Sequence, residues 1–495
     1  MTYPPCPTPF NLTQHVLSQA DDQADKIALA IVRAIGAERW SYQRLQSAVL
    51  GCATGLLEAG LVKGDRVLMR VGNTVEFLVV YLAAIAVGIV PIPTSSQLTE
   101  PEVQVLIDIT DPAAILHDGV TACPGGTRIL TLEDAKSWYS LPAAPYDLGD
   151  PDRLAYIIFT SGTSGTPRAV CHAHRAIWAR GMMMEGWYGL RESDRLMHAG
   201  AFNWTYTLGT GLLDPWTRGA TALIPAEGVD HHQLPLLMKR HVATIFAAAP
   251  GVYRNILRSS CLTLPKLRHG LSAGEKLLAT LRDAWISATG TPLYEAFGMS
   301  ECSTFISTAP GLPAVAPQSL GWPQKGRRVA VLAENGAAAT DEIGMIAIHK
   351  DDPGLMMGYL NDPEATRARF RGDWFLTGDT GHVTDQGDIH YHGRADDMMN
   401  AGGYRVSPLE VEAALLAHPD ITDVGATTVQ VKQDASVIGA FYVADQALEE
   451  DALMAFAAAS LARYKQPRLY RRVASMPRNA NGKLMRRRLP DLPPL

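Results

Sequence analysis

Apolar and polar residues alternate along the first 320 residues with two periods, one typical of strands and one typical of helices. Residues 66–71 form a short apolar run after a glycine-containing turn, and residues 76–87 follow with the length of a helix. Residues 154–159 are almost continuously apolar, which is typical of a strand buried in a sheet. This alternation predicts a layered α/β fold for a large N-terminal region.

The apolar run at residues 77–90 is too short to cross a membrane. It falls below the roughly 20 residues that a spanning helix needs, so we expect a helix buried in the core. The first 20 residues lack the continuous apolar segment of a signal peptide. We therefore expect a cytoplasmic protein without a membrane partner.

After residue 328 the pattern changes to short strands joined by tight turns. Residues 329–332 and 345–348 flank the turn Asn335-Gly336, which predicts a hairpin. A second hairpin is predicted around Gln386-Gly387. Short strands in this order are typical of a separate antiparallel region.

A small α+β domain is predicted at the C-terminus. Ser407-Pro408-Leu409-Glu410 has the spacing of a capping box with proline at the first helical position, and the helix should end near Pro419. We expect a multi-subdomain α/β region over residues 1–395 and a small α+β domain over residues 396–495.

Composition and charge narrow the class of protein. The chain has 495 residues, of which 47% are hydrophobic and 19% charged, so a folded protein of several domains is expected. A net charge of −6 gives no basic surface for nucleic acid. The six cysteines contain no C-x-x-C pair, which disfavours a zinc ribbon or a disulfide framework.

The segment after the strand at 154–159 has the composition of an anion-binding loop. Glycines let backbone N–H groups converge on an anion, hydroxyls add donors and a cation neutralises charge. The spacing is not that of a Walker loop. The residues expected to bind phosphate are Thr160, Ser161, Gly162, Thr163, Ser164, Gly165 and Arg168.

This string resembles the Tyr/Phe-Thr-Ser-Gly-Thr-Thr-Gly-x-Pro-Lys-Gly signature of the adenylate-forming superfamily, which includes acyl- and aryl-CoA synthetases, luciferases and peptide-synthetase adenylation domains. Arg168 and Ala169 depart from the usual Lys-Gly pair. Arginine keeps the charge but offers a wider, planar group, so closure of the loop on pyrophosphate is expected to differ in detail. The resemblance covers residues 150–490 and implies ATP, magnesium and coenzyme A as cofactors.

The resemblance assigns further nucleotide-binding residues. Ala273, Gly274 and Glu275 look like the loop that contacts adenine. Ser300 would contact the α-phosphate, and Glu301 would hold magnesium, a cation that prefers oxygen ligands.

Three residues nearer the C-terminus complete the predicted nucleotide site. The resemblance implies that Asp379 accepts hydrogen bonds from both ribose hydroxyls and that Arg394 also faces the nucleotide. Lys483 matches the lysine that adenylation requires, where a cation relieves repulsion between the carboxylate and the phosphate. The other basic residues of this tail are expected to be solvated.

The same resemblance implies a mobile C-terminal lid. Asp396 would be the hinge between one orientation that presents Lys483 and another that presents residues 400–405. In the second orientation, Gly403 would line the pantetheine tunnel and Arg405 would lie close to coenzyme A.

The acid should be aromatic or of medium chain length. Amino-acid-activating relatives carry Phe-Asp where this chain has Phe202-Asn203, so an ammonium group would have no partner. The sequence near Tyr206 resembles benzoate- and medium-chain acyl-CoA ligases. The residues expected to contact the acid are Phe202, Asn203, Trp204, Tyr206, Phe297 and Gly298.

The expected reaction is ATP-dependent ligation of a small carboxylic acid to coenzyme A, and we allow for a homodimer. Alternatives are an acid–AMP ligase that loads a separate carrier protein, a luciferase-type oxygenase and a nucleotide-binding relative without catalysis. Three close pairs of histidines lack metal-site spacing and are expected to be solvated or hydrogen-bonded. These pairs are His172 and His174, His231 and His232, and His390 and His392.

Overall fold

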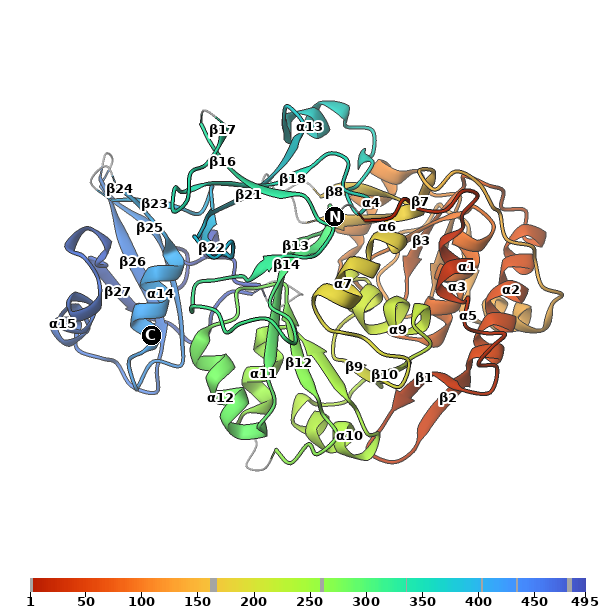
Figure 1. Ribbon diagram of the computed structural model, residues 1–495, viewed down its shortest axis with the longest axis horizontal. Helices are drawn as coiled ribbons and strands as arrows, with labels where there is room; N and C mark the ends of the chain where they lie inside the picture. Colours follow the sequence, from red (N-terminus) through yellow and green to blue (C-terminus); the bar gives the residue numbers. More distant parts are fainter. Residues whose placement is uncertain are drawn as a thin grey trace. The chain divides into compact units, whose positions relative to one another are not determined.

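Parallel strands form the central layer of the N-terminal region (Figure 1). The computed structural model describes residues 3–160, 167–258, 262–334, 336–401, 404–432, 435–478 and 483–495. Neighbouring strands from β13 to β1 run parallel, and antiparallel strands flank them at both edges. In spatial order the sheet contains β15 (Trp322–Pro323), β14 (Ser303–Ser307), β13 (Leu293–Met299), β12 (His269–Ala273), β11 (Ile245–Ala248), β9 (Arg195–His198), β10 (Thr221–Pro225), β1 (Ile27–Val32) and β2 (Ala37–Ser41).

A second, parallel sheet lies in the same region and contains the first predicted strand. Its strands are β4 (Val90–Pro93), β3 (Arg66–Arg70), β5 (Ala114–His117) and β6 (Ile129–Thr131). The predicted helix is α3 (Val75–Ala86), which is buried on nearly all sides. This burial explains its apolar composition and confirms that the run at 77–90 belongs to the core. Among the described residues, no helix has both the length and the apolar character that crossing a bilayer requires.

A small antiparallel sheet holds the ends of the predicted phosphate loop. It consists of β7 (Leu154–Thr160), β8 (Arg168–Ala173) and β19 (Gly358–Tyr359), in the order β19-β8-β7. Ile157 and Ala169 share a hydrophobic core with Leu68 and Ile115 of the parallel sheet. The strand predicted at 154–159 is therefore confirmed, and its buried face explains its apolar sequence.

Helices cover these sheets or connect their strands. They are α1 (Leu12–Val16), α2 (Tyr42–Glu58), α4 (Glu100–Thr110), α5 (Leu132–Ser137), α6 (Arg175–Ala179), α7 (Gly181–Gly186), α8 (Thr205–Leu208), α9 (Asp214–Thr217), α10 (Leu234–Arg240), α11 (Pro250–Ile256), α12 (Ala279–Thr289) and α13 (Pro363–Ala368).

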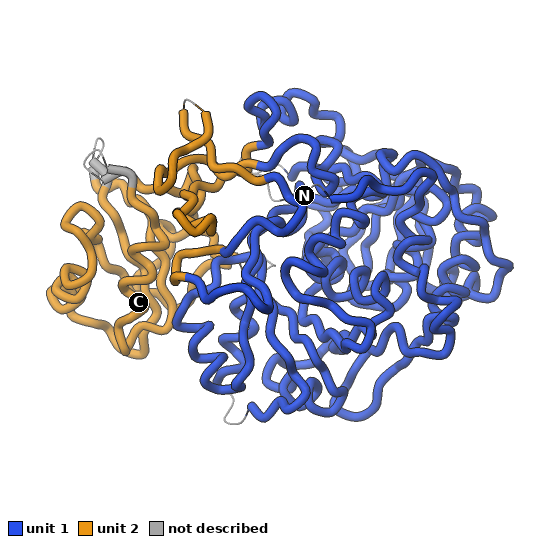
Figure 2. The backbone as a smooth tube through the Cα atoms, viewed as in Figure 1, with its two compact units in different colours: residues 1–315, 321–328, 348–375 blue, residues 316–320, 329–347, 376–495 orange. Residues whose placement is uncertain are grey.

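The chain divides into two compact units (Figure 2). Unit 1 comprises residues 1–315, 321–328 and 348–375, and unit 2 comprises residues 316–320, 329–347 and 376–495. The predicted fold class, a large α/β region with a small C-terminal α+β domain, is confirmed. The boundary at residue 396, as the place where a lid would turn, stays a prediction.

Unit 2 contains both predicted hairpin regions, with one change in pairing. Strand β16 (Val329–Ala333) pairs with the two-residue strand β17 (Gly336–Ala337), while β18 (Gly344–His349) lies on the other side of β16. Asn335 lies outside the described residues. The second hairpin is confirmed, because β21 (Trp374–Val383) pairs with β22 (Ile389–Arg394) across the predicted turn.

The C-terminal part of unit 2 packs helices against an antiparallel pair with one parallel strand added. Its elements are β23 (Met399–Ala401), β24 (Tyr404–Val406), α14 (Pro408–Leu416), β25 (Asp423–Lys432), β26 (Ala435–Val443), α15 (Glu450–Ser460) and β27 (Leu469–Arg472). Helix α14 begins at Pro408 as predicted, but the capping box does not form. Glu410 instead pairs with Lys465 at 2.9 Å.

Candidate active site

The predicted phosphate loop joins two antiparallel strands. Thr160 at the end of β7 lies opposite Arg168 at the start of β8. Ser161, Gly162, Thr163, Ser164 and Gly165 lie outside the described residues. The Arg168 guanidinium carbon lies 5.2 Å from the ring centroid of Tyr359, a cation–π distance. The strand pair therefore fixes both ends of the loop, and an aromatic ring holds its cation.

Glu301 lies in the tight turn between β13 and β14. Its side chain is buried, at 8% exposure, and its Oε1 accepts a 2.8 Å hydrogen bond from the Tyr359 hydroxyl. Burial and the nearby Glu301 carboxylate raise the pKa of Tyr359, so its hydroxyl stays protonated and donates. A carboxylate oxygen in this position suits magnesium, which commonly binds one or two protein carboxylates together with substrate phosphates.

Close packing explains the glycine before this turn. A Cβ at Gly298 would lie 2.2 Å from the backbone oxygen of Ser303, on the neighbouring strand. Ser303 itself has a positive φ of 61°. The turn that carries Ser300 and Glu301 therefore depends on glycine at position 298.

The loop expected to contact adenine follows strand β12. Ala273 is buried, and Gly274 has a φ of +95°. A Cβ at Gly274 would lie 2.5 Å from the Trp204 indole, so the ring lies directly against this loop. Glu275 follows at a half-buried position. The backbone shape thus requires glycine here, which agrees with a close-fitting binding loop.

A buried carboxylate that the sequence analysis missed supports the same loop. Glu295 on β13 accepts hydrogen bonds from Lys276 at 2.7 Å and from the Leu277 backbone at 2.7 Å. Arg282 adds a contact of 3.2 Å. The position of Glu295 inside a strand gave no indication of this role, because its partners come from the loop and the helix that precede β13.

Unit 2 brings Asp379 and Arg394 together on paired strands. Asp379 is buried at 5% exposure, and Tyr391 donates a 2.7 Å hydrogen bond to its Oδ1. Arg394 approaches Oδ2 at 3.3 Å and also reaches Asp396 at 3.2 Å. Burial and the Asp379 carboxylate raise the pKa of Tyr391 well above its ordinary value. The carboxylate expected to bind ribose is therefore held at both oxygens.

The remaining predicted residues of unit 2 are described only in part. Lys483 is exposed, and the next residue, Leu484, packs against the hydrophobic core around Phe441. Gly403 lies outside the described residues. Arg405 belongs to β24. Asp396 is also within 3.5 Å of Arg487, so the predicted hinge residue contacts two arginines.

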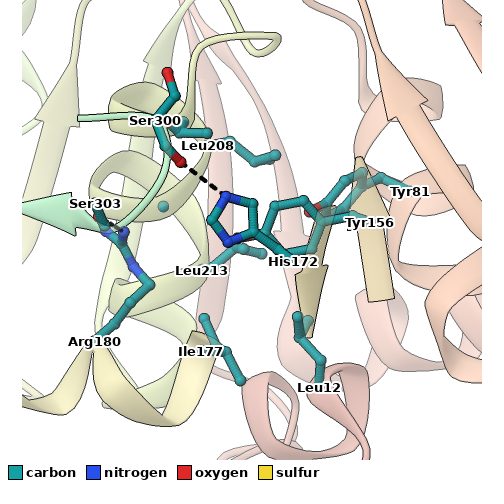
Figure 3. A pocket seen from close by; sticks show the side chains of 12 residues that line it. Leu12, Tyr81, Tyr156, His172, Ile177, Arg180, Leu208, Leu213, Ser300 and Ser303 are labelled. Atoms are coloured by element: carbon teal, nitrogen blue, oxygen red, sulfur yellow. Dashed lines mark hydrogen bonds between the residues drawn. The ribbon is translucent and has the colours of Figure 1, made fainter. Parts of the chain in front are cut away.

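A pocket that is partly open to solvent lies in unit 1 beside Ser300 (Figure 3). We call it the His172 pocket. The apolar residues that line it include Leu12, Ile177, Leu208 and Leu213. Its ring-bearing and polar side chains are Tyr81, Tyr156, His172, Arg180, Thr205 and Ser303.

The residues expected to contact the acid are not among those that line this pocket. Phe202 packs 5.6 Å from Phe77, and Tyr206 packs against Trp187 and Trp204. Thr205, from the same segment, does line the pocket. Contacts of Phe202, Asn203, Trp204, Tyr206, Phe297 and Gly298 with the acid stay a prediction.

Sequence reasoning gave no pocket role to His172 and did not single out Arg180. The ring of His172 is buried at 3% exposure, and its Nε2 lies 2.8 Å from the carbonyl oxygen of Ser300. The prediction that His172 is solvated or hydrogen-bonded is therefore confirmed in its second form. His392 lies 2.8 Å from His382, so it is hydrogen-bonded too. Among the described residues, no three His, Cys, Asp or Glu side chains are grouped to hold a metal.

Comparison with known proteins shows the family. Residues 16–360 match the AMP-binding enzyme family, and residues 410–483 match the AMP-binding enzyme C-terminal domain. The chain is 30% identical to the 3-hydroxybenzoate–CoA ligase of Aromatoleum sp. (strain CIB), over 92% of each chain. It is 27% identical to the mitochondrial acyl-coenzyme A synthetase ACSM3 of Rattus norvegicus, over 91% of this chain and 84% of that one.

A solved structure agrees with this result. A benzoate CoA ligase from Burkholderia xenovorans LB400 superposes with a TM-score of 0.87 at 26% identity, covering 97% of this chain and 99% of that one. The buried carboxylates, the glycine-shaped turns and these matches lead to one conclusion: the chain belongs to the AMP-binding enzyme family.

Proposed function

We propose that this AMP-forming acid–thiol ligase activates an aromatic carboxylic acid as its acyl-adenylate and transfers the acyl group to coenzyme A. The observation that carries the aromatic assignment is the His172 pocket, which presents the rings of Tyr81, Tyr156 and His172 next to Ser300. Flat, ring-lined walls suit an aromatic group. The relatives named as ligases of 3-hydroxybenzoate and benzoate support this choice.

The reaction has two balanced steps. A carboxylate oxygen of the acid attacks the α-phosphorus of ATP, the bond to pyrophosphate breaks, and acyl-AMP forms. The sulfur of coenzyme A then attacks the acyl carbon, AMP leaves, and the thiol proton passes to solvent. ATP, coenzyme A and a small carboxylic acid are thus the substrates.

The chain's own residues supply orientation and charge. Asp379 would bind the ribose, Ser300 would contact the α-phosphate, and Lys483 would offset negative charge during adenylation. Glu301 would hold magnesium, which when bound neutralises phosphate charge. We further propose that the C-terminal domain, residues 396–495, changes orientation about Asp396 between the two steps, and that the reaction takes place in the cytoplasm.

Half-reaction assays test this function. Pyrophosphate release and coenzyme A-dependent AMP formation would be measured with benzoates, straight-chain acids of two to twelve carbons and several amino acids. Turnover of a benzoate that needs coenzyme A is the expected result. Selective turnover of straight-chain acids would overturn the aromatic assignment. Adenylate formation that coenzyme A does not discharge would favour loading of a carrier protein, and ATP binding without turnover would indicate a relative that has lost catalysis.

A further inference from the structure

The His172 pocket contains a buried hydrogen-bond acceptor without a partner. Nε2 of His172 faces the carbonyl oxygen of Ser300 at 2.8 Å, and because a carbonyl only accepts, Nε2 carries the proton. Nδ1 then has a lone pair. Among the described residues, no group forms a hydrogen bond with this nitrogen, which is shielded from solvent. Buried polar atoms of this kind are rare and call for an explanation.

The imidazole is neutral at physiological pH and fixed in place. Burial, together with the nearby cations Arg175 and Arg180, lowers the pKa of His172 to about 4, against which the bond to Ser300 acts only in part. The ring stacks on Tyr156 with centroids 4.9 Å apart and an interplanar angle of 17°. Figure 3 shows Nδ1 on the side of the ring away from Ser300, facing the pocket.

The second polar group of the pocket is a guanidinium whose charge is already compensated. Arg180 donates from Nε and Nη2 to the two oxygens of Asp214, at 2.6 and 2.5 Å. Nη2 also donates to Thr210 at 3.1 Å, and Nη1 donates to Ser303 at 2.7 Å. A guanidinium has five N–H donors. Within the described part of the chain, these four bonds leave one N–H of Nη1 for a ligand.

We propose that Nδ1 of His172 accepts a hydrogen bond from a hydroxyl group on the ring of the acid substrate, and that Arg180 can donate to the same hydroxyl oxygen. This inference rests on the proposed function and names the substrate class within it. A hydroxyl both donates and accepts, which matches one free acceptor and one free donor. An unsubstituted ring would leave Nδ1 unpaired, and a second carboxylate could not donate to it.

A substrate series on the wild-type enzyme isolates this hydrogen bond. The value of kcat/KM for coenzyme A-dependent AMP formation would be measured with benzoate and with its hydroxy-, amino-, methoxy- and methyl-substituted forms at each ring position. A methoxy oxygen accepts but cannot donate. At one ring position we expect the hydroxy acid to exceed both the methoxy and the methyl analogues by about 10-fold or more.

The variant His172→Phe tests the residue itself. Phenylalanine keeps a ring on Tyr156 and removes Nδ1, so the hydroxy-to-methoxy ratio should fall to within about 2-fold. The control His269→Phe changes a buried histidine outside the pocket and should keep the wild-type ratio. If His172→Phe does not fold, the substrate series on the wild-type enzyme still tests whether a ring hydroxyl is recognised, and equal reaction of the hydroxy and methoxy acids overturns the proposal.

The outcomes separate this inference from the function on which it rests. If benzoates are turned over but hydroxy and methoxy forms react equally, or if His172→Phe keeps the ratio, the hydroxyl assignment is wrong and the ligase function stands. A preference for amino- over hydroxybenzoates also overturns the hydroxyl assignment. If no aromatic acid is turned over while acids of another class are, the proposed function itself falls.

Discussion

The Tyr359 hydroxyl donates a 2.8 Å hydrogen bond to Oε1 of Glu301 across 58 residues of sequence. The ring of the same tyrosine lies 5.2 Å from the guanidinium carbon of Arg168. One side chain therefore contacts both the proposed magnesium ligand and the cation at the end of the phosphate loop. Its strand, β19, pairs with β8, the strand that begins with Arg168, so the two side chains come from neighbouring strands.

Replacing Tyr359 by phenylalanine should impair adenylation. The ring and its contact with Arg168 remain, but Oε1 of Glu301 loses a partner in a buried site. Because hydrogen bonds to charged groups contribute about 1.5–3 kcal/mol, we expect kcat/KM for MgATP to fall about 10-fold or more. Pyrophosphate release, measured against free magnesium, checks this. An unchanged magnesium dependence would contradict the role given to the pair.

Asp379→Asn should weaken ATP binding. An amide has one oxygen where the carboxylate has two, and it does not attract Arg394 as an anion does. We expect the KM for ATP to rise roughly 10- to 100-fold with a smaller change in kcat. Tyr391→Phe is the matched control variant, since it keeps the Asp379 carboxylate and removes only the 2.7 Å hydrogen bond to its Oδ1. Equal ATP affinity in Asp379→Asn and wild type would refute ribose recognition by Asp379.

Lys483→Ala should separate the two half-reactions. Adenylate formation should be lost, because no cation would offset the charge at the phosphate, while thioester formation from supplied acyl-adenylate should persist. Arg488→Ala, an exposed basic residue of the same tail, is the control and should keep both. Equal loss of both half-reactions in Lys483→Ala would rule out a change of orientation between the steps.

A methyl group at position 298 should disturb the turn that carries Glu301. In Gly298→Ala, the Cβ would lie 2.2 Å from the Ser303 oxygen and 2.5 Å from the Thr304 Cα, so backbone must move. Overpacking of this kind destabilises by about 1–3 kcal/mol. Gly251→Ala adds the same methyl group in open space and should be tolerated. Urea unfolding and pyrophosphate release would measure both effects, and similar behaviour of the two variants would contradict the packing argument.

Lowering the pH should destabilise unit 1 at pH values still above those at which carboxylates titrate. Burial lowers the pKa of several histidines to about 3 or 4, so between pH 6.5 and 4 the unfolded chain binds protons that the native state does not. The free energy of unfolding should therefore be highest above pH 6.5 and fall below it, by up to about 1.4 kcal/mol per pH unit for each group. These buried histidines are His172, His174, His198 and His269.

Urea unfolding between pH 5 and 7 measures the slope of the free energy of unfolding against pH. His172→Phe should make it shallower, because one group no longer gains a proton on unfolding. His232→Gln changes an exposed histidine and should leave the slope as in wild type. A pH-independent free energy of unfolding over this range would show that the buried histidines are not neutral in the native state.

The sequence by itself determined the fold class, the order of the main elements and the family. Strand periodicity is local, so the apolar run before Thr160 and the turn at Gln386-Gly387 predicted β7 and the hairpin of β21 and β22. Residues that bind a common nucleotide occur in short segments whose order along the chain can be read directly. The predicted strands at 329–332 and 345–348 are neighbours in the sheet as β16 and β18, but the short strand β17 was not predicted. It pairs with the other edge of β16, and which edge of a strand is paired depends on the whole sheet.

Only the tertiary structure decided what surrounds those segments. Leu12, Tyr81, His172, Arg180 and Ser303 come from distant parts of the sequence and meet in one pocket. Burial, hydrogen-bond partners and the resulting pKa of an imidazole are properties of that assembly and not of a local sequence pattern. The residues that would choose among acids are therefore found from three-dimensional packing, whereas those that would bind the invariant nucleotide are found from sequence.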